Sequence, residues 1–144
     1  YPNGEMNWPW QPSFQATAPA VTNGGGLTIV FGGAAHNTGS HYNTSNGRFT
    51  APVAGKYLFT FAILMNPASA TSYSRVLFAV NDSDSTSYGD TLSQYNSSST
   101  SSYYAISASV ILSLGANDYV TLENHGTDPT YGTQYGSFCG QLLS

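Results

Sequence analysis

The chain of 144 residues has very little charge, and its few cations set limits on its partners. Arg48, Lys56 and Arg75 are the only cations, and charged residues make up 7% of the sequence, against roughly 25% in ordinary globular proteins. This composition argues against nucleic-acid binding through phosphate contacts and against a polybasic membrane patch. Because 35 residues are Ser or Thr, solubility must come from hydroxyls and amides. Such a nearly neutral surface favours an extracellular or virion-surface location.

Cysteine and long apolar runs are also scarce. Cys139 is the single cysteine, so no internal disulfide can form. It lies in the apolar stretch "SFCGQLLS", which favours a small buried hydrophobe over a nucleophile or a metal ligand. No stretch approaches the roughly 20 apolar residues of a membrane-spanning helix, so we predict no membrane insertion.

The residues needed for common catalytic chemistries are not grouped. The three histidines, His36, His41 and His125, stand in turn-like contexts rich in Gly and Asn. No serine occupies a Gly-x-Ser-x-Gly elbow, and the seven acids are scattered rather than paired for glycoside hydrolysis. We therefore predict a protein that is not an enzyme.

The sequence divides into a lead-in and one domain. Residues 1–13 hold three prolines together with Trp8 and Trp10, which excludes a regular helix and suits a docking arm. Residues 14–144 form one domain of short β-like runs separated by Asn-Gly and Gly-Gly turn signals about every ten residues. This spacing predicts an all-β sandwich or barrel with almost no helix.

The tract between residues 82 and 102 is polar and of low complexity. We interpret it as solvated loops, with a binding site as the alternative, because loops on rigid β scaffolds often carry function. Tyr88, Tyr95 and Asn96 are the candidate ligand-contacting residues.

The same tract offers oxygen ligands to a metal ion. Its candidate calcium ligands are Asp82, Asp84 and Asp90. A solvated loop without metal is the favoured reading, because the spacing does not match an EF-hand. No other cofactor is predicted.

A ladder of aromatic, Asn and Gly residues in the first half of the chain is more specific. Its members are Phe31, Asn37, Tyr42, Phe49, Gly55, Tyr57, Phe59 and Phe61. The ladder resembles the signature of the globular head domain of the first complement component, a family similar in fold to tumour necrosis factor. "VILSLGANDYVTLEN" and "SFCGQLLS" resemble later strands of the family, although Asn117 stands where a glycine is usual.

The resemblance implies an antiparallel jelly-roll sandwich of about ten strands, assembled as a homotrimer. It also implies that Phe138 and some of Tyr57, Phe59 and Phe61 face the core or other subunits, and the sequence leaves open which do. The scarcity of charge favours a bacterial or bacteriophage member of the family.

Three functional hypotheses follow. The first is a non-enzymatic trimeric recognition or capping head on a fibre or particle surface, which binds a surface protein or glycan by multivalency. The second is a structural cement or decoration protein of a capsid, fibre shell or surface layer, docked through Trp8 and Trp10. The third is a secreted cytokine- or complement-like soluble ligand.

Overall fold

The computed structural model describes residues 10–83, 92–96, 102–132 and 134–144, and in these residues every regular element is a β-strand. Among them no helix is long and apolar enough to cross a membrane. The strands are β1 (Ser13–Pro19), β2 (Leu27–Thr28), β3 (Phe31–Thr38), β4 (Tyr42–Asn43), β5 (Arg48–Thr50), β6 (Gly55–Met65), β7 (Tyr73–Val80), β8 (Leu92–Asn96), β9 (Tyr104–Leu114), β10 (Tyr119–Asn124) and β11 (Gly136–Leu142).

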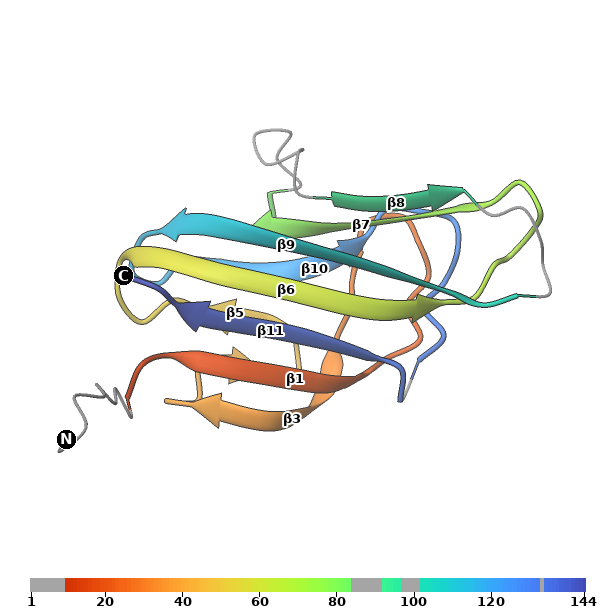
Figure 1. The fold of residues 1–144 in the computed structure, drawn as a ribbon. Helices are drawn as coiled ribbons and strands as arrows, with labels where there is room; N and C mark the ends of the chain where they lie inside the picture. Colours follow the sequence, from red (N-terminus) through yellow and green to blue (C-terminus); the bar gives the residue numbers. More distant parts are fainter. Residues whose placement is uncertain (1–9, 84–91, 97–101, 133) are drawn as a thin grey trace, which may run out of the picture.

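The strands form two antiparallel sheets that pack face to face (Figure 1). One sheet has five strands in the order β3-β1-β11-β6-β9. The other follows the order β4-β5-β10-β7-β8, and the two-residue strand β2 also pairs with β10. The chain order crosses between the sheets repeatedly, as a jelly roll requires. The prediction of an all-β antiparallel jelly roll is confirmed, with eleven strands in the described residues.

Strand β6 supplies much of the core by strict alternation. Tyr57, Phe59 and Phe61 point into the sandwich, whereas Lys56, Leu58 and Thr60 alternate with them on the outer face. The relative exposures of the three rings are 0%, 0% and 3%. Each buried ring contributes about 2 kcal/mol or more of transfer free energy.

Phe138 of β11 lies in the middle of the aromatic core. Its ring contacts those of Phe14, Phe31, Tyr42, Phe59 and Phe78, with centroid distances between 5.0 and 6.4 Å. Its exposure is 0% within one chain. The sequence left open whether these rings face the core or another subunit. Within one chain they lie in the core, since they have almost no exposed surface left to contact another subunit.

The Asn46–Gly47 pair closes the hairpin between β4 and β5, as its turn chemistry indicates. Residues 44–47 form the turn, and the Gly47 N–H donates to the carbonyl of Asn43 at 2.9 Å. Gly47 has φ +75°, and a side chain there would meet the carbonyl oxygen of Ile29. Glycine is therefore required at this position.

The two ends of the sandwich differ in what they carry. At the terminal end, β1 begins and β11 finishes, and the Leu142 N–H donates to the carbonyl of Pro12 at 3.0 Å. The Gln11 side chain also donates to the carbonyl of Leu142. The opposite end, called the distal end below, is where β6 finishes and β9 and β11 begin (Figure 1).

Candidate functional site

The outer face of the five-stranded sheet, called the uncharged face below, is the first candidate surface. Its side chains alternate with the buried ones and are mostly small, and only Lys56 among them is charged. They are Ser13, Gln15 and Thr17 on β1; Ser137, Cys139 and Gln141 on β11; Lys56, Leu58, Thr60, Ala62 and Leu64 on β6; and Ala105, Ser107, Ser109, Ile111 and Ser113 on β9. Ile111 is 59% exposed here and lies opposite Leu58.

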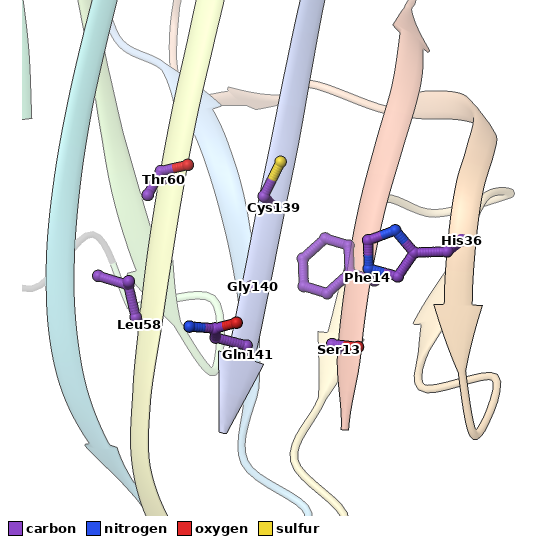
Figure 2. A pocket seen from close by; sticks show the side chains of 8 residues that line it. All are labelled: Ser13, Phe14, His36, Leu58, Thr60, Cys139, Gly140 and Gln141. Atoms are coloured by element: carbon purple, nitrogen blue, oxygen red, sulfur yellow. The ribbon is translucent and has the colours of Figure 1, made fainter. Parts of the chain in front are cut away.

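Two shallow hollows mark this face. The first, of about 240 Å³, lies toward the terminal end between side chains of β1, β3, β6 and β11 (Figure 2). His36, Leu58, Thr60, Cys139 and Gln141 surround it. The second, of about 470 Å³, lies toward the distal end and is bordered by Gln15, Thr17, Ser137 and Tyr135 among others. Neither hollow has an Asp, Glu, Lys or Arg among its lining residues.

Tyrosines gather at the distal end, which is the second candidate surface. Six of the nine tyrosines in the described residues lie there: Tyr73, Tyr95, Tyr103, Tyr104, Tyr131 and Tyr135. We call Tyr103, Tyr131 and Tyr135 the distal tyrosine cluster. The ring of Tyr131 meets that of Tyr103 at 4.6 Å and that of Tyr135 at 5.4 Å, in both cases edge to face.

Tyr95 and Tyr104 form a second pair of rings, which is held by a hydrogen bond to a buried carboxylate. Their centroids are 4.4 Å apart, and the Tyr104 hydroxyl donates to the carboxylate of Asp128. Asp128 is buried and also accepts the Ala68 N–H at 2.8 Å. This pair is therefore tied into the fold, although Tyr95 itself is 45% exposed and Asn96, next to it, is exposed.

The predicted calcium ligand Asp82 already has two partners. Its Oδ2 lies 2.7 Å from Nη2 of Arg48 and accepts the Tyr119 hydroxyl at 2.7 Å. This hydrogen bond to Asp82 raises the pKa of Tyr119 above its ordinary value. Asp84 and Asp90 lie outside the described residues, and no group of three or more His, Cys, Asp or Glu that could hold a metal occurs within them.

The remaining predicted residues are spread over the molecule. Trp10, at the terminal end, is 84% exposed. Trp8 and Tyr88 lie outside the described residues. Tyr103, Tyr131 and Tyr135 could not be predicted as a site from the sequence, because nothing in their spacing indicates that their rings meet.

Titratable groups are not combined into a catalytic arrangement in the described part of the chain. His125 Nε2 lies 2.8 Å from Oε2 of Glu123, which is buried, and neither of them lines one of the two hollows. His36 borders the first hollow, and the other side chains there are aromatic, aliphatic, hydroxyl, amide or thiol groups.

Comparisons with known proteins agree with the fold. A family model described as "C1q domain" matches residues 13–143. The globular domain of zebrafish complement 1qA protein is similar with a TM-score of 0.68 and 18% identity, over 93% of this chain and 98% of that one.

Two tumour-necrosis-factor-like structures are similar as well. The Eiger TNF of S. frugiperda has a TM-score of 0.68 and 14% identity, over 93% of each chain. Murine APRIL has a TM-score of 0.66 and 11% identity, over 92% of this chain and 99% of that one. No curated protein sequence matches.

Proposed function

Because the chain belongs to the C1q domain family, whose members are ligand-binding and recognition heads, we propose that it is a non-enzymatic homotrimeric recognition head. Such domains and their tumour-necrosis-factor-like relatives are trimeric, bind protein or glycan ligands, and usually act outside the cell or at a surface. Display on a fibre or particle surface is the specific setting that we propose for this chain.

The uncharged face carries the trimer in this proposal. Only one of the sixteen outward side chains is charged. Covering this face with another subunit therefore avoids most of the free-energy cost of desolvating charges. Ile111 and Leu58 add an apolar strip that gains free energy when covered. The aromatic rings of the core hold each subunit together, and the outer residues of the same strands join the copies.

Trimer formation gives the head its binding mechanism. Three copies of a weak site on one rigid body raise the effective concentration for the second and third contacts, so avidity exceeds the affinity of one site. The distal tyrosines lie opposite the end where the described chain begins and ends. A head attached through that terminal end would present them outward.

The trimer is tested by light scattering on the chain and on two matched variants. The wild type is expected at about three times its 15.2 kDa mass. Ile111→Asp places a carboxylate on the uncharged face and should yield monomers. Leu27→Asp is the control, because Leu27 is similarly exposed but belongs to the other sheet. A wild-type monomer at micromolar concentration would overturn the proposal.

A structural role as a cement or decoration protein is the second candidate, and one observation favours it. Trp10 is 84% exposed, directly before Gln11 and Pro12, which hydrogen-bond to Leu142. An anchored, exposed indole suits docking to a shell. Removal of residues 1–10 leaves Gln11 and Pro12 in place; loss of particle binding with ligand binding retained would support docking by this arm.

A further inference from the structure

The distal tyrosine cluster presents open aromatic faces. Tyr103 and Tyr135 are 57% and 52% exposed, and Tyr131 between them is 37% exposed. Both ring pairs are near perpendicular, at 71° and 69°, so the central ring meets its neighbours edge to face and does not cover them by stacking. The two outer rings therefore remain free to stack on a ligand.

The segment that carries Tyr131 and Tyr135 is held by backbone hydrogen bonds. The Tyr131 N–H donates to the carbonyl of Leu64 at 2.9 Å, and the Leu64 N–H donates to the carbonyl of Tyr135 at 3.0 Å. Between them Gly132 has φ +98° and lies so close to Val21 that a side chain would meet Val21 Cγ2 at 2.6 Å. The backbone at Tyr131 and Tyr135 is thus held in place by the fold, which lowers the entropy cost of positioning these two residues for a ligand.

The surroundings of the cluster are polar but neutral. The hollow bordered by Tyr135 is lined by the amide of Gln15, the hydroxyls of Thr17 and Ser137, and small apolar groups, without a charged side chain. Arg48 and Lys56 lie on strands β5 and β6 away from the distal end, and Arg75 lies on β7 of the other sheet, where its Nε donates to Oε1 of Gln94 at 3.0 Å. The hollow beside the cluster therefore has no cation among its lining residues, and the described residues contain no group of three or more His, Cys, Asp or Glu that could hold a metal.

From these observations we propose that the distal tyrosine cluster binds neutral oligosaccharides without a metal ion. The proposal rests on the recognition role above and names its ligand class and its residues. The C–H groups on one side of a pyranose ring carry partial positive charge and stack on the electron-rich face of an aromatic ring. The hydroxyls of the three tyrosines, which lie outside the sixteen positions of the uncharged face, can exchange hydrogen bonds with the sugar hydroxyls.

The test uses the full chain on an array of neutral oligosaccharides, built from hexoses, N-acetylhexosamines and deoxyhexoses, beside sialylated and sulfated ones. Binding is expected for neutral members and unchanged by EDTA. Tyr103→Ala and Tyr135→Ala should each lower the affinity for the best neutral ligand by about tenfold or more, as measured by calorimetry. Tyr103→Phe and Tyr135→Phe keep the stacking face and should lose less.

Trp10→Ala is the control, since Trp10 is an exposed aromatic residue at the terminal end, away from the distal surface. Light scattering on every variant separates this proposal from that of the trimer. A wild-type monomer that binds neutral glycans through Tyr103 and Tyr135 would support the site and remove only the avidity. Binding to no neutral member, or to anionic members alone, would overturn the site. Loss of the trimer in Tyr103→Ala would assign the rings to subunit contact and overturn it as well.

Discussion

The guanidinium of Arg48 lies 2.7 Å from the carboxylate of Asp82, and its carbon lies 4.1 Å above the ring of Tyr119, whose hydroxyl reaches the same carboxylate oxygen. Asn81 and Asp82 both have φ +55° and form the tight turn that follows β7. The arrangement joins β5, β7 and β10 at the terminal end. It gives Asp82 a structural role, whereas the sequence offered it as a calcium ligand only in the alternative to a metal-free loop.

Removal of calcium should therefore leave the stability unchanged. Asp82 Oδ2 is already shared by Arg48 and Tyr119, so a cation there would have to displace two partners. Thermal melts with EDTA and with millimolar calcium are expected to give the same midpoint. A midpoint several degrees higher with calcium would contradict this expectation and restore a site that includes Asp82.

Asp118 should contribute stability that is lost in acid. The Asn81 amide, and then the Gly115 N–H, donate to its carboxylate and hold its pKa below the ordinary value of 3.8. A lowered folded-state pKa means that the contribution is complete above about pH 3.8 and disappears as the pH falls through the folded value. Melts of Asp118→Asn against pH should show a deficit relative to wild type that shrinks below this pH.

Asn81→Gly is the control for that prediction, because glycine accepts φ +55° and lacks the donating amide. It should reproduce part of the acid effect without adding backbone strain. A deficit of Asp118→Asn that stays constant from pH 7 to pH 2 would show that the carboxylate charge is irrelevant.

Tyr42 should make the fold sensitive to alkali. Burial raises the pKa of its hydroxyl to about 12 from an ordinary 10.0, partly offset by the Phe31 N–H that donates to it. The stabilisation is complete below pH 10 and falls as the pH rises toward 12, because the unfolded chain ionises first. Tyr42→Phe should flatten the loss of melting temperature over this range, whereas Tyr95→Phe, with an exposed ring, should not. An equal slope in all three proteins would contradict the prediction.

The fold could be predicted from the sequence because its signature residues are buried aromatics, together with half-buried Asn and Gly residues that shape the turns. Asn37 shows the reason: its side chain donates to the carbonyl of Tyr42 and accepts the Tyr42 N–H, which closes the turn before β4. Gly55 shows it again, since a side chain there would meet the carbonyl oxygen of Ser144 at 2.6 Å. Contacts within the fold constrain these residues. Their pattern therefore predicts the fold and does not predict which surface residues bind a ligand.

The distal tyrosine cluster could not be predicted from the sequence, because its members are exposed residues of separate segments. Tyr103 stands before β9, and Tyr131 and Tyr135 stand between β10 and β11, so their contact depends on where β6 places Leu64. The partner of Asp82 could not be predicted for the same reason. The sequence offered Asp82 as a calcium ligand in the alternative to a metal-free loop, and Arg48, 34 residues earlier, pairs with it in the folded chain.

A substitution of Phe138 tests whether the predicted aromatic residues stabilise the core of one subunit or join subunits. Its ring is 0% exposed and contacts five other rings, so Phe138→Ala should leave a cavity and lower the free energy of unfolding by about 3–5 kcal/mol. Urea denaturation at equal protein concentration measures this loss, since the stability of an oligomer depends on concentration. Tyr103→Ala removes an exposed ring and should change the stability by less than about 0.5 kcal/mol. If Phe138→Ala instead kept the stability of the subunit and only abolished the trimer, the ring would lie between subunits and the assignment to the core would be wrong.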